Sequence, residues 1–377
     1  MFRIKQWIKM ILQNIILPLI YRFYAGRPVE KGLVLLADAH HREMPFSMER
    51  MAELLKEKEK AGELHLVYFI CDFNRLSFSA MALYLIRFMK SYARAEKVFI
   101  CDYYLPVSSC KKRKETQVIQ LWHSCGLMKK IAYDTGEDIP RGYKGNMFAN
   151  YSLLTLSAPA CVPVHAKALH LSESHIEATG VSRTDFYFDP LWNENCKKEF
   201  YGQYPQAEGK KILLWAPTFR GNAAHPYLEG LEEIRSLEKE LGEDYFLILK
   251  AHPHVDAHGQ VSNCDIPTER LLGLTDILIT DYSSVFFDYL ICGKDKEKAA
   301  VLYAPDLKEY EAKRGFYLSY RDIPFEVAET GAELLRAIKN APGWAGSHKE
   351  EIAAFRRLYT GSCDGQSTQR IYRRVFK

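Results

Sequence analysis

Short apolar runs alternate with amphipathic segments along most of the chain. The runs rich in Val, Ile and Leu are predicted strands, and they are Leu33–Ala37, His65–Ile70, Val98–Cys101, Val118–Trp122, Ile212–Ala216, Tyr245–Lys250, Asp276–Thr280 and Ala300–Tyr303. Segments with helical spacing lie between them, among them Ser47–Lys60 and Ser79–Ala93. Because strands covered on both faces read as near-continuous apolar runs, this order predicts an α/β protein built on parallel sheets.

The polar stretch from Pro190 to Lys211 interrupts the alternation. It is poor in β-branched residues and contains Pro205 and Gly209, so we place the domain boundary there. A chain of 377 residues is long enough for two domains. We therefore predict two Rossmann-like, doubly wound parallel-sheet domains, residues 29–205 and 206–377, that face a central cleft. The C-terminal helix is expected to pack back on the first domain.

A basic amphipathic helix is predicted over residues 1–28, where no acidic residue precedes Glu30. Its apolar positions are Ile4, Trp7, Ile8, Ile11, Leu12, Ile15 and Leu19. Such a helix can lie on an anionic membrane surface or pack on the protein's own core, and the pattern leaves both open. No apolar run reaches the ~18–20 residues that span a bilayer, and Gln13 and Asn14 disfavour a signal peptide. We expect a peripheral protein at the cytoplasmic face of the cell membrane.

Composition excludes several classes of protein. Hydrophobic residues make up 47% and charged residues 26%, which is typical of a globular chain and not of a disordered one. The net charge of +4 is too small to indicate a nucleic-acid binder. The nine cysteines include no CxxC pair, so neither a zinc site nor a disulfide framework is predicted, and scattered thiols fit a reducing compartment.

Polar residues follow five of the predicted strands. The five segments are Asp38–His41, His123–Gly126, Pro217–Arg220, Ala251–His254 and Asp281–Ser284. In open parallel sheets, ligands bind beyond the carboxyl ends of the strands. These segments therefore predict the edges of an active-site cleft.

Ser283 and Ser284 come where the helix after the strand Asp276–Thr280 is expected to begin. Serine is a good N-cap, and the first N–H groups of a helix lack partners, so this end can bind a phosphate. A plain capped helix would use the same residues. Asp281, Asp288 and Asp364 are either orienting groups or caps.

Candidate phosphate contacts also follow two other strands. Lys250 and His252 lie at one strand end. Thr218 and Arg220 follow another, and Arg suits bidentate phosphate binding. The ordinary alternatives are a hydrogen-bonded structural histidine and a surface arginine.

His123 is the candidate general base, because a neutral imidazole can take a proton near pH 7. The small residues after it would allow a substrate to approach closely. Lys129 and Lys130, expected one helical turn later, would either steer a phosphorylated acceptor or be solvated helix charges. Cys125 allows a thiol nucleophile, although no acyl-transfer context accompanies it.

Taken together, these segments resemble the CDP-glycerol glycerophosphotransferases of wall teichoic acid synthesis. The likeness runs from about residue 95 to the C-terminus, in order and with plausible spacing. It is carried by RKETQVIQLWHSCGLMKKIAYDTG (113–136), ILLWAPTFRGN (212–222), LILKAHPHV (247–255), LLGLTDILITDYSSVFFDYLICGK (271–294), VLYAPDLKEYEAKRGFYLSY (301–320) and GSCDGQSTQRIYRRV (361–375). The chain length looks more like that of the primase, which adds the first glycerol phosphate, than that of the long polymerases.

The resemblance implies a GT-B fold, with CDP-glycerol held mainly by the C-terminal domain and an undecaprenyl-diphosphate-linked disaccharide as acceptor. It implies that His123 and His252 are the functional pair and that the hydroxyls of Ser283 and Ser284 take part. Ser124-Cys125 stands where the family commonly has Gly-Thr or Ala-Asn, a departure that bears on the acceptor.

We therefore expect a teichoic acid primase that transfers glycerol phosphate from CDP-glycerol to this acceptor and releases CMP, with no cofactor, no protein-bound metal and no nucleic acid. The alternatives are a glycerol- or ribitol-phosphate polymerase of the same family and a GT-B glycosyltransferase that uses a nucleotide sugar. The expected catalytic residues are His123 and His252. The expected substrate-binding residues are Thr218, Arg220, Lys250, Ser283, Ser284, Asp288, Lys129 and Lys130.

Overall fold

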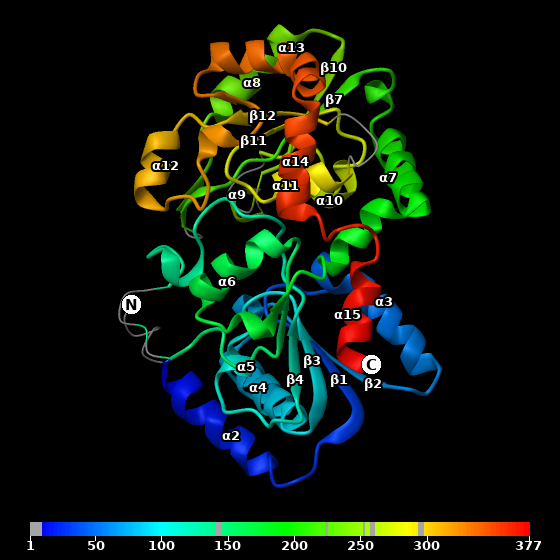
Figure 1. Ribbon diagram of the computed structural model, residues 1–377, viewed down its shortest axis with the longest axis vertical. Helices are drawn as coiled ribbons and strands as arrows, with labels where there is room; N and C mark the ends of the chain where they lie inside the picture. Colours follow the sequence, from blue (N-terminus) through cyan, green and yellow to red (C-terminus); the bar gives the residue numbers. More distant parts are fainter. Residues whose placement is uncertain are drawn as a thin grey trace. The chain divides into compact units, whose positions relative to one another are not determined.

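The computed structural model describes residues 10–139, 143, 145–222, 225–251, 253–256, 261–292 and 298–377. They form two compact units (Figure 1). Unit 1 holds the described residues of Met1–His123, Ala132–Asp185 and Gln366–Lys377, and unit 2 holds those of Ser124–Ile131 and Phe186–Gly365.

Unit 1 is built on a six-stranded, all-parallel sheet with the order β2-β1-β3-β4-β5-β6. The strands are β1 (Glu30–Asp38), β2 (His65–Ile70), β3 (Ala95–Ile100), β4 (Gln117–Gln120), β5 (Leu153–Thr155) and β6 (Ile176–Glu177). The order changes direction between β1 and β3, which is where doubly wound sheets hold their ligands.

Helices cover both faces of this sheet. One face packs against α3 (Phe46–Lys60) and α15 (Ser367–Phe376), whose Met51 and Ile371 join a buried cluster with Val34 and Phe99. The other helical segments of unit 1 are η1 (Leu12–Ile16), α2 (Leu17–Tyr24), η2 (Phe73–Arg75), α4 (Phe78–Tyr92), α5 (Leu105–Ser108), η3 (Ala132–Asp134), η4 (Pro159–Cys161), α6 (Val162–Leu169), η5 (Glu173–His175) and the unit 1 part of η6 (Ser182–Phe188).

Unit 2 repeats the plan with a five-stranded parallel sheet of order β10-β7-β11-β12-β13. Its strands are β7 (Lys211–Trp215), β10 (Tyr245–Leu249), β11 (Ile277–Thr280), β12 (Ala299–Tyr303) and β13 (Glu326–Ala328). An antiparallel hairpin, β8 (Arg220–Asn222) with β9 (His225–Tyr227), follows β7. Here the order changes direction between β7 and β11.

The helices of unit 2 are α7 (Pro190–Gln203), η7 (Pro205–Ala207), α8 (Leu231–Leu241), α9 (Pro253–Asp256), α10 (Thr268–Leu271), α11 (Val285–Cys292), α12 (Leu307–Lys313), η8 (Tyr320–Asp322), α13 (Gly331–Ser347) and α14 (Lys349–Thr360). In unit 2, Ile234 of α8 and Ile338 of α13 pack in a buried core cluster with Leu213 and Ile279 of the sheet.

The predicted parallel-sheet α/β architecture is confirmed, and every predicted strand overlaps an observed one. The polar stretch in which we place the domain boundary is largely helix α7. Asp189 caps this helix by accepting hydrogen bonds from the N–H groups of Leu191 and Trp192, and Pro190 at the first position fixes its φ angle.

Candidate active site

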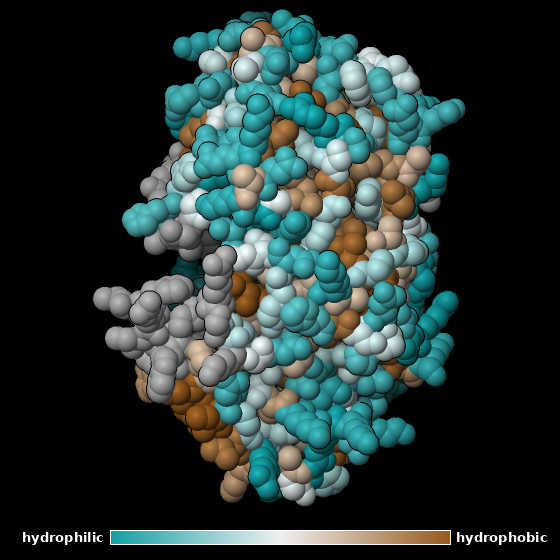
Figure 2. Space-filling view, turned by 60° about the vertical axis from the view of Figure 1, so that its left-hand side comes forward, coloured by the Kyte–Doolittle hydropathy of each residue, from teal (hydrophilic) through white to brown (hydrophobic). Residues whose placement is uncertain are grey.

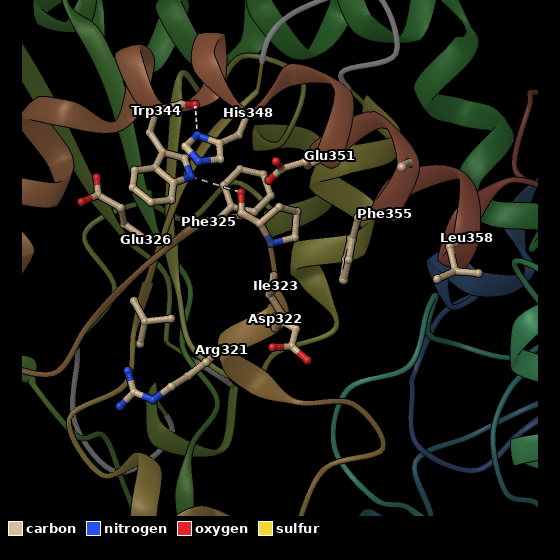
Figure 3. Close-up of a pocket in the computed structure, with 13 residues that line it drawn as sticks. Arg321, Asp322, Ile323, Phe325, Glu326, Trp344, His348, Glu351, Phe355 and Leu358 are labelled. Atoms are coloured by element: carbon tan, nitrogen blue, oxygen red, sulfur yellow. Dashed lines mark hydrogen bonds between the residues drawn. The ribbon is translucent and has the colours of Figure 1, made fainter.

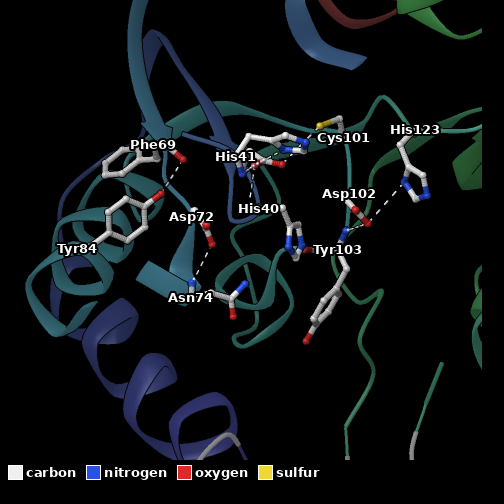
Figure 4. A network of polar contacts seen from close by, with 11 residues as sticks. His40, His41, Phe69, Asp72, Asn74, Tyr84, Cys101, Asp102, Tyr103 and His123 are labelled. Atoms are coloured by element: carbon white, nitrogen blue, oxygen red, sulfur yellow. Dashed lines mark hydrogen bonds and ion pairs between the residues drawn. The ribbon is translucent and has the colours of Figure 1, made fainter. Parts of the chain in front are cut away.

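Three neighbouring strands of unit 1 end in polar residues, as Figure 4 shows. Asp38 ends β1 and is followed by His40 and His41, whereas Asp102 follows β3 and His123 follows β4. Because parallel strands end at the same edge of the sheet, all these groups gather where the strand order changes direction.

His123 faces a carboxylate. Its Nδ1 lies 3.5 Å from Oδ1 of Asp102, and both side chains are partly exposed. The Asp102 carboxylate is itself held, because Oδ1 accepts a hydrogen bond of 2.6 Å from the N–H of Tyr103. A histidine oriented through Nδ1 presents Nε2 to a reacting group, which is the arrangement of a general base.

The residue before His123 adopts a backbone conformation that is rare for residues other than glycine. Trp122 has a φ of +61°, in the left-handed region. The buried amide of Gln120 holds this turn, because its Oε1 accepts from the N–H of Trp122 at 3.0 Å and its Nε2 donates to the carbonyl of Asp102 at 3.0 Å. One side chain thus ties the backbone of Asp102 to the residue before His123.

A second histidine supports the indole of Trp122. The ring of His165 meets it edge-on, with centroids 5.6 Å apart, and the ring of His123 lies 4.9 Å from it on a tilt. Nδ1 of His165 donates to the carbonyl of Cys161 at 2.9 Å. Burial and, to a smaller extent, the nearby His123 lower the pKa of His165 to about 4 despite this hydrogen bond, so His165 is neutral near pH 7.

In unit 2, Arg220 lies buried between two carboxylates instead of at a surface. Its Nε and Nη2 donate to Asp306 at 2.6 and 2.9 Å, and Nη2 lies 2.9 Å from Oδ2 of Asp281. Although burial alone would lower the pKa of Arg220, the hydrogen bonds to Asp306 and the charge of Asp281 raise it. The bidentate partner of this guanidinium is therefore Asp306, where we had predicted a phosphate, and its charge is already balanced.

The same network fixes the ends of β7 and β11. Oδ1 of Asp281 accepts from the N–H groups of Thr218 at 2.7 Å and Tyr282 at 2.5 Å. The predicted serines follow at once, at the start of α11 and half-buried, with the hydroxyl of Ser283 accepting from the N–H of Val285. Thr218, Ser283 and Ser284 thus come together at the edge where ligands of such sheets bind.

The remaining predicted residues of unit 2 are more scattered. Asp288 is only 3% exposed within α11, so its side chain is not presented to a ligand at the surface. Lys250 follows β10, and its Nζ donates to the carbonyl of Cys264 at 2.7 Å. His252 lies outside the described residues.

The segment after His123 is extended, and the predicted helical turn is wrong. Its hydrogen bonds come from a distant part of the chain: the N–H of Lys130 donates to the carbonyl of Gly315 at 3.0 Å, and Lys129 pairs with Phe316. Gly126 serves packing: its φ is +67°, and a Cβ there would lie 2.3 Å from the ring of Phe287. Lys129 and Lys130 therefore belong to unit 2, with the serines of α11.

A pocket of about 760 Å³ lies elsewhere in unit 2, as Figure 3 shows. Its lining includes Trp344 and His348, whose rings stack with centroids 4.1 Å apart, and Phe325, which precedes β13. The pocket is therefore near the amino end of an edge strand, whereas the polar strand ends described above are carboxyl ends.

A sequence profile of the family described as CDP-glycerol:poly(glycerophosphate) glycerophosphotransferase matches residues 19–377. The chain belongs to this family. Its predicted membership, and its interpretation as a phosphotransferase enzyme, are confirmed.

Two curated relatives and one solved structure illustrate the likeness. A teichoic acid ribitol-phosphate primase of Bacillus spizizenii strain W23 is 29% identical over 91% of this chain and 90% of its own length. A teichoic acid glycerol-phosphate primase of Bacillus subtilis strain 168 is 31% identical over 73% of this chain and 72% of its own length. The structure of the wall teichoic acid polymerase TagF superposes with a TM-score of 0.73 at 20% identity, covering 99% of this chain and 97% of that chain, which shows a shared fold.

Asp102, Gln120, Trp122 and His165 are site residues that sequence analysis missed in this member of the family. Asp102 directly follows the predicted strand Val98–Cys101. Applying the strand-end argument to that strand, as to the other five, would have found it.

Proposed function

We propose that this protein is a teichoic acid primase that transfers a polyol phosphate from a CDP-activated polyol to a lipid-linked acceptor. We further propose that its two Rossmann-like domains form a GT-B fold and bind the substrates in a cleft. The observation that carries the proposal is the His123–Asp102 pair at the strand edge of unit 1, in a chain of the glycerophosphotransferase family. We infer an undecaprenyl-diphosphate-linked disaccharide as acceptor.

In the proposed reaction, Nε2 of His123 takes the proton of the acceptor hydroxyl. The resulting oxygen attacks the β-phosphate of the CDP-polyol, the bond from that phosphorus to the bridging oxygen breaks, and CMP leaves. Asp102 stabilises the imidazolium that forms, because its carboxylate lies beside Nδ1. Preorganised charge of this kind supplies most of the rate enhancement in phosphoryl transfer.

The proposed contacts to the donor's phosphates are the hydroxyls of Ser283 and Ser284, the first N–H groups of α11, Thr218 and Lys250. The proposed second catalytic residue is His252. Lys129 and Lys130 are proposed to add positive charge in unit 2. We assign Arg220 the role of holding Asp281 and Asp306, because its charge is already balanced. We further propose that the protein itself holds no metal for this step, which EDTA would leave unaffected.

Glycerol was the polyol expected from the sequence, and a specific observation also favours ribitol. The ribitol-phosphate primase aligns over 90% of its own length, and the glycerol-phosphate primase aligns over 72%. Both CDP-glycerol and CDP-ribitol therefore belong in the assay.

Attachment to an anionic membrane surface is proposed for the N-terminal helical segment. None of the helices in the described part of the chain is long and apolar enough to cross a membrane. The segment has two apolar faces: Leu17 and Tyr21 are buried, with the ring of Tyr21 5.2 Å from that of Tyr92 in α4, whereas Leu19 and Phe23 are 62% and 81% exposed. Figure 2 shows hydrophobic side chains gathered over α2. Packing on the protein's own core therefore accounts for the face with Leu17 and Tyr21, and membrane attachment is proposed for the face with Leu19 and Phe23.

The deciding experiment incubates the full chain with CDP-glycerol or CDP-ribitol and a lipid-diphosphate disaccharide, and measures CMP release and product mass. We expect one added polyol phosphate. His123→Ala should lower kcat by ~10²–10⁴-fold, the usual contribution of a general base. Asp102→Asn should lower it on the order of a hundredfold, and His252→Ala by a similar factor.

His175→Ala is the matched control, because His175 is an exposed histidine of unit 1 away from this edge, and it should retain wild-type turnover. Release of UDP from a UDP-sugar, with none of CMP, would contradict the proposal in favour of a glycosyltransferase. Wild-type turnover by His123→Ala would remove this residue from the mechanism.

A further inference from the structure

A second histidine–carboxylate pair lies at the same sheet edge, and the proposed reaction does not use it. Asp38 is buried at the end of β1, and its Oδ2 accepts hydrogen bonds from the N–H groups of His40 and His41 at 2.8 Å each. The same oxygen lies 2.9 Å from Nδ1 of His41. Cys101 in turn donates its thiol to Oδ1 of Asp38 at 3.8 Å. Asp38 thus fixes both the backbone after β1 and the ring of His41.

His41 is held but accessible. Its side chain is 54% exposed, and because Nδ1 is directed to Asp38, Nε2–H remains as the donor for a ligand. The hydrogen bond that His41 donates to Asp38 outweighs burial and, with the negative charges of Asp38, Asp102 and Asp72, raises the pKa of His41. The charged form of His41 is therefore more favoured than that of a free histidine. Burial and the charges of Asp38 and Asp102 raise the pKa of Cys101, and the positive charge of Arg183 lowers it by less.

The pair is close to the proposed base. β1, β3 and β4 are consecutive in the sheet, and neighbouring strands lie ~5 Å apart, so His41 and His123 follow strands about 10 Å apart at one edge. Contacts connect the two pairs: the ring of His40 lies 3.4 Å from the carbonyl of Tyr103, whose N–H donates to Asp102. Figure 4 shows these side chains at the same end of the strands.

We propose that His41 binds the diphosphate of the acceptor, with Asp38 as its positioning residue. This inference rests on the proposed function, in which the donor's phosphates meet the serines of unit 2 and the acceptor hydroxyl meets His123 in unit 1. The charged His41 then lies close to His123 and would bind the same substrate, the acceptor. A charged N–H donor suits a phosphate oxygen, and the disaccharide of the acceptor separates its diphosphate from its reacting hydroxyl.

Steady-state kinetics of the full chain separate this role from catalysis and from donor binding. At pH 7, His41→Gln should raise the KM for the lipid-diphosphate acceptor at least about tenfold, the loss expected for one charged hydrogen bond. The KM for the CDP-polyol should stay within about twofold. An unchanged acceptor KM, or a rise confined to the donor KM, would overturn the proposal.

His65→Gln is the matched control. His65 also faces a carboxylate, with Nδ1 3.7 Å from Glu30, and is exposed, but it begins β2 and so lies at the opposite edge of the sheet. Its acceptor KM should equal that of the wild type, and a rise equal to that of His41→Gln would count against a local site.

Binding of inorganic pyrophosphate, measured by calorimetry, tests the site without turnover. At pH 6.5, His41→Gln should bind pyrophosphate about tenfold more weakly than the wild type. As the pH rises to 8.5 the affinity of the wild type should fall towards that of this variant, whereas His41→Lys should keep its affinity because its charge persists. Asp38→Asn should shift the loss of binding to lower pH, because the charge that raises the pKa of His41 is removed.

The two proposals can fail separately. If no pairing of donor and acceptor supports turnover, the proposed function fails, and the pyrophosphate titration still decides whether His41 binds diphosphate. If His41→Gln does not fold by circular dichroism, the contrast between the wild type and His41→Lys at pH 8.5 decides. Equal pyrophosphate affinity of these two proteins at pH 8.5 would overturn the inference.

Discussion

His165 shows how a single buried side chain can link the candidate base to the stability of unit 1. Its ring packs edge-on against Trp122, whose backbone places His123, and it is neutral because burial lowers its pKa to about 4. A charged ring at this position would be desolvated without a carboxylate partner. The candidate site therefore combines a neutral, buried His165 with His123, the proposed base.

This arrangement predicts that unit 1 loses stability in mild acid. The unfolded chain protonates His165 near pH 6.5, whereas the folded chain does so near pH 4, so the stabilising effect is complete above pH 6.5 and is lost as the pH falls towards 4. Between pH 7.5 and pH 5 the loss should be about 2 kcal/mol. His165→Asn keeps a donor for the Cys161 carbonyl but cannot ionise.

Urea unfolding at the two pH values measures the effect as a difference between the two proteins. The contributions of all other groups are the same in both proteins and cancel, so the wild type should lose about 2 kcal/mol more than His165→Asn. Equal losses would show that His165 is already charged, or is accessible to water, in the folded protein.

At the scale of elements, the sequence predicts well what is long and buried. The strands β1, β7, β10 and β12 have at least five residues each and near-continuous apolar character, so they stand out from their surroundings. Strands β5, β6 and β13 have only two or three residues, which is too few for a periodic signal. They form because they pair with neighbouring strands of the sheet.

The parts of the site that were missed depend on contacts between distant residues. The chain after His123 is extended because its partners are Gly315, Phe316 and Tyr317, almost two hundred residues away, and no local pattern reports them. Arg220 looked like a phosphate ligand because its partners Asp281 and Asp306 are 61 and 86 positions away. Local motifs predict where strands end, whereas the pairing of the strands in the sheet determines which side chains meet there.

Arg220 also provides a prediction at this scale, because it joins the end of β7 to the residues after β11 and β12. Arg220→Gln would leave the buried Asp281 and the partly buried Asp306 without their cation, and breaking a buried ion pair typically costs 3–5 kcal/mol. We therefore expect a marked loss of thermal stability. Combining this substitution with Asp306→Asn should restore part of it, because one uncompensated charge is removed.

Arg321→Gln is the control, because Arg321 pairs with Glu329 at the surface and such pairs contribute under about 1 kcal/mol. If Arg220→Gln unfolded at the wild-type temperature and lost only donor affinity, the arginine would be a phosphate ligand after all.

At the scale of the whole molecule, the N-terminal segment exposes several apolar side chains to water, which costs free energy of solvation. Ile15 is 54% exposed, and Leu19 and Phe23, spaced four residues apart along the same helical face, are more exposed still. Isolated exposed apolar residues are common, but an ordered row on one helix face is typical of an interaction surface. The opposite face is packed on α4, so the row is held in place by the fold.

Replacing Leu19 and Phe23 together with Glu should therefore reduce binding to vesicles of anionic lipid. Each apolar side chain that enters the interface contributes up to about 1.5–3 kcal/mol, and the new carboxylates would be repelled by the lipid headgroups. We expect at least a tenfold loss in the fraction bound by sedimentation, with unchanged turnover on a short-chain acceptor in detergent. Leu191→Glu on α7 is the matched control, since Leu191 is equally exposed at 66% but does not belong to this row. If Leu19 and Phe23 could be replaced without loss of vesicle binding, the attachment surface would have to be sought among the basic residues of the chain.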